Sequence, residues 1–238
     1  MQIYLSGQKY FGTLTLRLLL DLGHKIVGVS APRERADGAP DRLWQAAESA
    51  RIPLMEAGKL NADTLPEGVD LIVCAHSHEF IGRRTRLRAK LGAIGYHPSL
   101  LPLHRGRDAI KWAIRMGERV TGGTVFWLND VVDGGPVAVQ EFVFIRPNDT
   151  AEKLWQRDLQ PLGLRLFKKV LSDIASGIIV RIPQDPALAT WEPSLNPPRM
   201  HRPDLLMIGD ALKDYRVVVE REFEETMRLY SGDSASGC

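Results

Sequence analysis

The sequence has little cysteine, almost no net charge and no long hydrophobic run. Its 2 cysteines, Cys74 inside an apolar stretch and Cys238 at the last position, exclude a disulfide framework and indicate a reduced, cytoplasmic protein. Lysine and arginine outnumber aspartate and glutamate by 31 to 29, so the molecule as a whole is not an electrostatic nucleic-acid binder. No apolar stretch approaches the roughly 20 residues of a membrane span, and the first residues lack the pattern of a signal peptide.

What is present is typical of a globular α/β protein. The chain has 238 residues, of which 44% are hydrophobic and 25% charged, enough for a substantial core without cross-links. Short apolar runs alternate with amphipathic segments, which predicts a mainly parallel sheet covered on both faces. The predicted strands are 2–6, 25–30, 69–75, 92–97, 124–128 and 137–144, and the predicted helices are 10–22, 42–50 and about 150–177.

The carboxy-terminal part has a different composition. Asp149 and Glu152 have the spacing of a capping box before the long helix. A Pro-rich stretch follows at 181–203, and a charged segment with helical periodicity spans 212–230. We therefore predict one large domain over residues 1–190 and an extension over 191–238, made of a linker and a helix. That helix is expected to pack on the domain or against a second subunit, which leaves a homodimer open.

Three segments come at carboxyl ends of predicted strands, where open α/β sheets bind ligands. The loop from Gly7 to Gly12 is interpreted either as a tight strand-to-helix turn or as a loop whose amides face a substrate anion. His76 and His78 would share a face of an extended chain. Because no cysteine or third histidine is near them in sequence, a polar pocket wall is favoured over a metal site. The third segment starts at His97.

This third segment carries the strongest motif. Residues 96–102 read Tyr-His-Pro-Ser-Leu-Leu-Pro, and Asp133-Gly134-Gly135 follows 36 residues after His97. The pair resembles the signature of the folate-dependent formyltransferase family, Asn-x-His-Pro-Ser-Leu-Leu-Pro followed by Asp-x-Gly. The resemblance implies a Rossmann-like domain, 10-formyltetrahydrofolate as co-substrate without a metal, and His97 and Asp133 as catalytic residues.

The chemistry is consistent with those two roles. Formyl transfer from an amide to an amine passes through a tetrahedral oxyanion, so the site needs a proton acceptor and charge stabilisation. Histidine can accept a proton near neutral pH. A carboxylate beside it favours the imidazolium and can relay a proton through water.

Gly95 is a departure from the family motif. It stands at the position of the family's asparagine, and glycine has no side-chain amide to donate to the oxyanion. Loss of one such donor typically costs about 10²–10³ in rate. Three interpretations stay open: a replacement donor, hydrolysis with water as acceptor, or a folate-binding module that has lost its activity. Residues 96–106 and 78–81 are most similar to the hydrolase domain of 10-formyltetrahydrofolate dehydrogenase, which also lacks the asparagine.

The resemblance also implies binding residues. The pterin is expected between the loops 76–82 and 129–134, and the acceptor near the first loop. The expected folate-binding residues are His76, Phe80, Ile81, Ser99, Asn129, Asp130 and Val132, and the expected acceptor-binding residues are Gly7, Gly12 and Arg105.

The acceptor is expected to be small. Five cations lie between Arg83 and Lys90, which indicates a solvated helix face, a site for a folate polyglutamate tail, or a contact with transfer RNA. The methionyl-tRNA enzymes carry an additional carboxy-terminal domain, for which the residues after Trp191 are too few. The sequence therefore predicts formyl transfer to the amine or hydroxylamine of a small molecule, with 10-formyltetrahydrofolate hydrolysis as the alternative and without a nucleic-acid or membrane partner.

Overall fold

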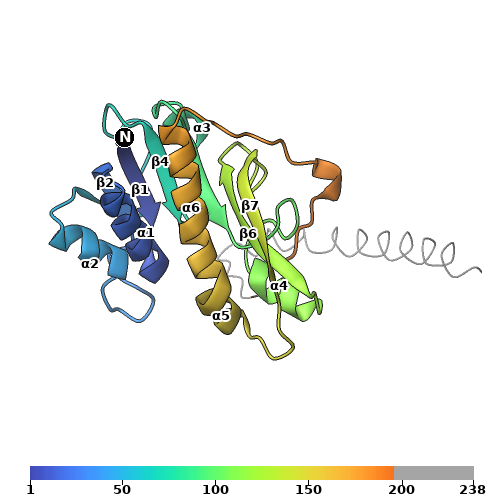
Figure 1. Ribbon diagram of the computed structural model, residues 1–238. Helices are drawn as coiled ribbons and strands as arrows, with labels where there is room; N and C mark the ends of the chain where they lie inside the picture. Colours follow the sequence, from blue (N-terminus) through green and yellow to red (C-terminus); the bar gives the residue numbers. More distant parts are fainter. Residues whose placement is uncertain (196–238) are drawn as a thin grey trace, which may run out of the picture. The chain divides into compact units, whose positions relative to one another are not determined.

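A seven-stranded sheet forms the centre of the protein (Figure 1). The computed structural model describes residues 1–195, and one compact unit comprises Met1–Ser194. The strands follow the order β3-β2-β1-β4-β5-β6-β7. Neighbours from β3 to β5 pair in parallel, whereas β6 pairs antiparallel with both β5 and β7. Their bounds are β1 Gln2–Gly7, β2 Lys25–Ala31, β3 Leu54–Glu56, β4 Leu71–Ala75, β5 Ala93–His97, β6 Val120–Trp127 and β7 Val137–Phe144.

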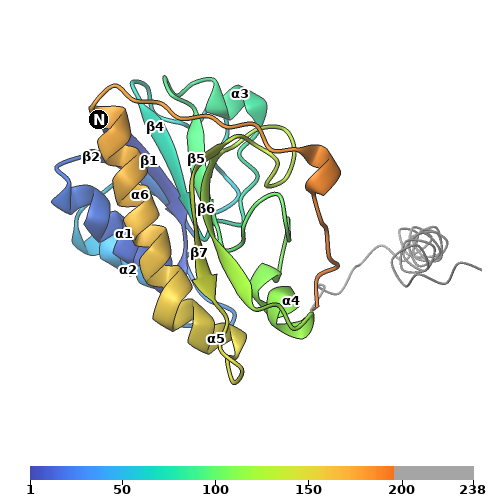
Figure 2. The same ribbon diagram turned by 45° about the vertical axis from the view of Figure 1, so that its right-hand side comes forward.

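Helices alternate with the strands along the first part of the chain, as βαβ units require. Figure 2 shows α1, α2 and α6 on one side of the sheet, and the segment after α6 running toward α4 on the other. The helices are α1 Lys9–Asp21, α2 Arg42–Ser49, α3 Arg83–Arg86, α4 Ala109–Arg115, α5 Ala151–Leu154 and α6 Gln160–Ala175, with a π-helical turn at Trp155–Leu159 and a short 3-10 helix at Pro186–Leu188. The α/β class expected from the sequence is confirmed.

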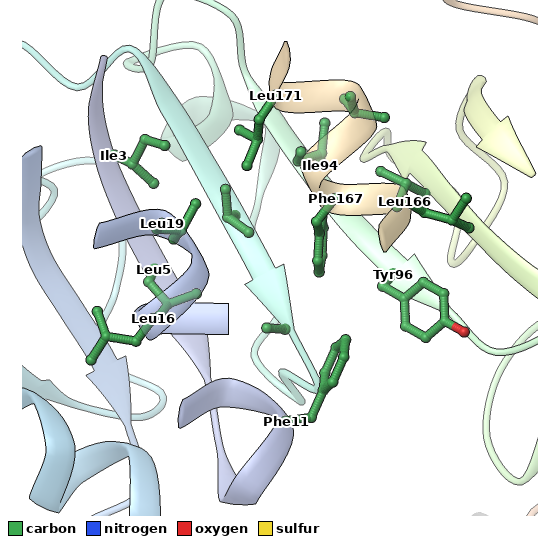
Figure 3. Close-up of a cluster of buried hydrophobic side chains, with 14 of the residues drawn as sticks. Ile3, Leu5, Phe11, Leu16, Leu19, Ile94, Tyr96, Leu166, Phe167 and Leu171 are labelled. Carbon is green, nitrogen blue, oxygen red and sulfur yellow. The ribbon is translucent and has the colours of Figure 1, made fainter. Parts of the chain in front are cut away.

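The main core lies between the sheet and the helices α1 and α6 (Figure 3). Leu16 and Leu19 of α1 and Leu166 and Phe167 of α6 are almost completely buried against the strands. In α6 the buried positions Leu162, Leu166 and Val170 recur every four residues, with Phe167 and Leu171 beside them, so they form one face of the helix. A second buried cluster covers the opposite face of the sheet and includes Tyr4, Ile72, Cys74, Ile81 and Ala93. β4 is therefore apolar throughout because both of its faces are buried, whereas the edge strand β7 alternates with exposed positions.

The first strand of the β-rich region, β6, begins earlier than the sequence predicts. β6 begins at Val120, four residues before the predicted start, and continues through Gly122 and Gly123. A side chain at position 123 would collide with Tyr96, because an added Cβ would lie 2.3 Å from the Tyr96 hydroxyl. Glycine is thus required here by packing, although it weakens the local strand pattern. The sequence did not predict β3 and α4, which have 3 and 7 residues.

The long helix predicted at about 150–177 is interrupted. It begins at Thr150, whose hydroxyl accepts the N–H of Lys153, whereas the Asp149 carboxylate binds Arg157 instead of capping the helix. The π-helical turn precedes Pro161, which lacks the N–H that an α-helix would donate to the carbonyl four residues earlier. The carbonyl of Leu159, within this turn, accepts a hydrogen bond of 2.7 Å from the Tyr96 hydroxyl.

The predicted carboxy-terminal helix at 212–230 lies outside the described residues. Within residues 1–195, none of the helices combines the length and the apolar character that crossing a bilayer requires.

Two phenylalanines are expected to differ greatly in how much they contribute to the free energy of unfolding. Phe167 is completely buried, whereas Phe142 on β7 is 61% exposed. We expect Phe167→Ala to lower the free energy of unfolding by about 3–5 kcal/mol through lost burial and the cavity left behind. The same substitution at Phe142 should cost less than about 0.5 kcal/mol. Urea unfolding followed by circular dichroism measures both values, and equal losses would contradict this description of the core.

Candidate active site

A cavity of about 910 Å³ opens at the carboxyl ends of β4 and β5. Its walls come from several parts of the chain: the first turn of α1, the end of β4 with the β4–α3 loop, the end of β5, the start of α4 with the residues before it, the end of β6 with the following loop, and α5 with the following turn. Adjacent parallel strands end at the same edge of a sheet, so segments distant in sequence meet here. The volume lies near the upper end of the range for small-molecule sites.

His97 ends β5 and faces this cavity with a fixed orientation. Its Nε2 lies 2.7 Å from the backbone carbonyl of His104, and the ring is buried. Because a carbonyl can only accept, Nε2 carries the proton and donates it. In the neutral ring the lone pair is therefore on Nδ1. The backbone of the following loop thus determines which nitrogen of His97 can accept a proton.

Asp133 supplies the carboxylate that faces this nitrogen. Its Oδ2 lies 3.5 Å from His97 Nδ1 and accepts the backbone N–H of Gly106 at 2.8 Å. Asp133 has φ +49°, a left-handed conformation that is uncommon for residues other than glycine. The structure therefore brings together the two residues that the motif separates by 36 positions.

Gly95 lies two residues before His97 on the same strand and also lines the cavity. A Cβ built there would meet Leu128 Cδ1 at 3.1 Å, Phe126 Cε1 at 3.5 Å and Cys74 Cβ at 3.6 Å. The surroundings of the missing side chain are thus apolar. Burial, and less strongly the charge of Glu79, raises the pKa of Cys74 to about 12, so this cysteine is a neutral part of the wall.

His76 and His78 lie in the β4–α3 loop, with their ring centroids 5.7 Å apart. Burial, assisted by the positive charge of Lys9 and by His78, lowers the pKa of His76 to about 4. Burial, followed by the charges of Arg107 and Lys9, also lowers the pKa of His78. His76 is therefore a neutral imidazole at physiological pH. Within residues 1–195, no group of three or more His, Cys, Asp or Glu side chains is arranged to hold a metal ion.

The same loop is anchored by Glu79. Its carboxylate accepts the hydroxyl protons of Ser6 at 2.7 Å and Ser30 at 2.5 Å, and the backbone N–H of Gly58 at 2.5 Å. Ser6 and Ser30 belong to β1 and β2. The loop that carries His76 is thus tied to the carboxyl ends of two neighbouring strands.

An ion pair between the buried Arg86 and the exposed Asp130 joins the two loops expected to bind the pterin. Arg86 donates to the carbonyl of Ile81 at 2.6 Å and to the carboxylate of Asp130 at 2.5 Å. The Arg86 side chain is 9% exposed. One member of the basic run at 83–90 therefore serves as an internal tie, and not as part of a solvated face.

Most of the residues predicted from the sequence surround the cavity. They are His97, Asp133, His76, Phe80, Ile81, Asn129 and Val132. Asp130 is adjacent to the wall and takes part in the ion pair with Arg86.

Four predicted residues lie behind the wall, which differs from the expectation. Ser99 is completely buried, and its hydroxyl donates to the carbonyl of Leu103 at 2.6 Å. An added Cβ would lie 2.5 Å from the Ala75 carbonyl at Gly7 and 2.9 Å from Leu43 at Gly12, so these glycines permit close packing. Arg105 is buried and donates to Gln184 at 2.6 Å and 3.1 Å.

Several residues at the site carry no recognisable signal in the sequence. Lys9 and Phe11, between the two glycines, and Trp155 after α5 line the cavity. Trp155 lies within the predicted helix, where its spacing indicates only a core position. Gln184 follows Asp133 by 51 residues in a Pro-rich stretch, and no local pattern in the sequence points to it.

Comparisons with known proteins agree with the geometry. A family model described as formyl transferase matches residues 31–170. The mitochondrial 10-formyltetrahydrofolate dehydrogenase of Mus musculus is 36% identical over 202 residues, which cover 81% of this chain and 22% of that protein. The methionyl-tRNA formyltransferase of Lactobacillus delbrueckii subsp. bulgaricus is 30% identical, with 80% and 63% covered. The chain thus spans about a fifth of the length of the dehydrogenases that it matches.

Solved structures share the fold. The phosphoribosylglycinamide formyltransferase of Bacillus halodurans superposes with a TM-score of 0.62 at 22% identity, covering 74% of this chain and 96% of that one. A sugar 3N-formyl transferase solved with dTDP and 5-N-formyl-THF gives 0.67 at 18% identity, covering 81% and 69%. Together with the matching family model, the sequence relatives and the paired His97 and Asp133, these similarities establish that the chain belongs to the folate-dependent formyltransferase family.

Proposed function

We propose that this protein transfers the formyl group of 10-formyltetrahydrofolate to the amine or hydroxylamine of a small molecule. The observation that carries the proposal is the arrangement of His97, whose Nε2 donates to a backbone carbonyl while Nδ1 faces the Asp133 carboxylate at 3.5 Å. The nitrogen that can accept a proton is thus the one beside a negative charge. A general base in this position typically contributes about 10²–10⁴ in rate.

The apolar side of the cavity suits a folate ring system. Phe80, Ile81, Leu128, Val131 and Val132 line it, with Asn129 as a polar neighbour. Flat heterocycles bind in such sites through apolar contact and a few directed hydrogen bonds. Bound 10-formyltetrahydrofolate supplies the formyl group as an amide, and the protein residues manage the protons.

His97 takes the proton that the attacking amine loses, through Nδ1. The resulting imidazolium is stabilised by the Asp133 carboxylate, which the N–H of Gly106 holds in place. The same proton can pass to the nitrogen from which the formyl group departs, so no net proton is consumed. Lys9, Trp155 and Glu152 line another part of the cavity, and we assign this part to the acceptor.

Hydrolysis is the second candidate, and Gly95 is the observation that favours it. The family's amide donor is absent, and the neighbouring atoms of Leu128, Phe126 and Cys74 offer no substitute at that position. A relative at 36% identity is named a 10-formyltetrahydrofolate dehydrogenase. Water in place of an amine would release formate and tetrahydrofolate, with His97 accepting a proton from water.

One assay distinguishes the candidates. Purified protein is incubated with 10-formyl-5,8-dideazafolate, with and without a panel of small amines and hydroxylamines, and deformylated folate and formate are followed. We expect release of the deformylated folate to depend on an amine, with no matching formate. Equal formate release without an amine would establish hydrolysis. Binding without turnover under every condition would contradict both candidates and indicate a folate-binding module.

One substitution at each residue of the catalytic pair is expected to lower kcat strongly. His97→Gln removes the proton acceptor, and Asp133→Asn removes the charge while it keeps an oxygen for the N–H of Gly106. We expect each to lower kcat by about 10²–10⁴, with the folate KM changed less than about threefold. The control is Asp173→Asn, which changes an exposed ion pair with Lys169 on α6. Retention of kcat by His97→Gln would show that the site assignment is wrong.

Gly95→Asn tests the missing donor. The nearest contact for a new Cβ is the end of a flexible side chain, Leu128 Cδ1 at 3.1 Å, which can move. If the protein is a transferase limited by this donor, the variant should raise the rate of amine formylation, up to about 10²-fold. Gly95→Ala is the matched control, since it adds the Cβ without the amide. Equal rates for the two variants would show that another group already stabilises the formyl oxygen.

A further inference from the structure

The segment Gln184–Glu192 crosses behind the catalytic loops. It follows α6 and runs toward α4, coloured orange in Figure 2. Two backbone hydrogen bonds bind it to the loop after β5, from Arg105 N–H to the Thr190 carbonyl at 3.0 Å and from Thr190 N–H to the Pro102 carbonyl at 3.2 Å. The segment therefore contacts the loop that positions His97.

Gln184 connects this segment to the catalytic aspartate. Its side-chain Nε2 donates to the backbone carbonyl of Asp133 at 2.8 Å and to that of Gly135 at 2.6 Å. Its Oε1 accepts from Nε and Nη2 of the buried Arg105 at 3.1 Å and 2.6 Å. Both polar atoms of the Gln184 amide thus form hydrogen bonds. They connect the loop that carries Asp133 to the loop after β5, which follows His97.

The other end of the segment holds His104, whose carbonyl binds His97. The N–H of His104 donates to the Thr190 hydroxyl oxygen at 2.7 Å. The buried ring lies between two carboxylates, with Nε2 2.8 Å from Glu118 and Nδ1 3.0 Å from Glu192. The contact of Nε2 with Glu118 is a hydrogen bond, whereas Nδ1 approaches the Glu192 carboxylate closely without hydrogen-bond geometry.

Asp133 and His104, two residues that the segment contacts, have an uncommon backbone conformation. Asp133 has φ +49° and His104 has φ +53°. Non-glycine residues in this region cost about 1–3 kcal/mol each and persist where the surroundings determine them. Gln184 and Thr190 of the segment form hydrogen bonds with the backbones of Asp133 and His104. These contacts therefore stabilise the conformations of the two catalytic loops.

We propose that Gln184 and Glu192 are positioning residues for the catalytic pair. Gln184 holds the Asp133 carboxylate at its distance from His97. Glu192 holds the His104 ring, and through it the carbonyl that fixes the tautomer of His97. This proposal rests on the proposed function for the roles of His97 and Asp133.

Gln184→Glu tests the first contact with little change in shape. The carboxylate keeps the acceptor for Arg105, whereas an oxygen replaces the donor that faces the carbonyls of Asp133 and Gly135. We expect kcat to fall about 10- to 100-fold, because small displacements at a reacting centre are costly, while the folate KM changes less than threefold. Asp185→Asn is the control, since among residues 1–195 that neighbouring side chain accepts the N–H of Ala187 and does not bind either catalytic loop. An unchanged kcat in Gln184→Glu would overturn this part of the proposal.

Glu192→Gln tests the second contact by a signal that does not require activity. Nuclear magnetic resonance detects the Nε2–H proton of His97, identified by its loss in His97→Gln, and the backbone amide of Gly106 that donates to Asp133. Glu192→Gln should shift the His97 signal or broaden it by exchange with water, and Gln184→Glu should shift the Gly106 signal. Asp185→Asn should leave both unchanged.

The two kinds of measurement separate the two proposals. A wild-type protein without turnover would contradict the proposed function, while the resonance shifts would still test the positioning residues. Normal turnover with both signals unmoved in Gln184→Glu and Glu192→Gln would contradict the positioning role alone.

Discussion

The hydrogen bond from His97 Nε2 to the carbonyl of His104 is the contact on which the candidate site depends. It is 2.7 Å long and lies away from bulk water. Because it commits one nitrogen as a donor, it leaves the other as the proton acceptor beside Asp133. Without this carbonyl contact, the neutral ring could direct its N–H to the Asp133 carboxylate, and the proton acceptor beside the carboxylate would be lost. The loop after β5 therefore determines the chemistry of a residue that lies in a strand.

The need to hold side chains and carbonyls in fixed orientations around His97 also accounts for the backbone strain at this site. Five of the non-glycine residues with positive φ are Lys9, His76, His104, Asp108 and Asp133. Four of them line the cavity, and His104 binds His97 through its carbonyl. Such conformations concentrate where a side chain or carbonyl must be aimed at a ligand, and the surrounding contacts bear their cost. Here, the hydrogen bonds of Glu79, Gln184 and Thr190 provide those contacts.

The sequence was informative where a local signal existed. The strand ending at His97 and the Asp-Gly-Gly turn are continuous motifs, so both catalytic candidates could be named. Gln184 carries no such signal, because its function depends on a contact with a residue 51 positions away. Arg86 was grouped with exposed cations, since composition does not reveal which member of a basic run is buried. β3 has 3 residues, too short for its alternation to be recognised.

The two sides of the cavity differ in how they are held. The loops 76–82 and 129–134 are joined by the buried Arg86, which donates to the carbonyl of Ile81 and to the exposed carboxylate of Asp130. These two contacts of Arg86 restrain the separation of the loops without a bound ligand. The other side carries Lys9 and Arg107 at the wall, and their charges add to the effect of burial in lowering the pKa of His78. The proposed function places the acceptor on this side, where the long side chains of Lys9 and Arg107 can change rotamer without breaking the contact of Arg86 with Asp130.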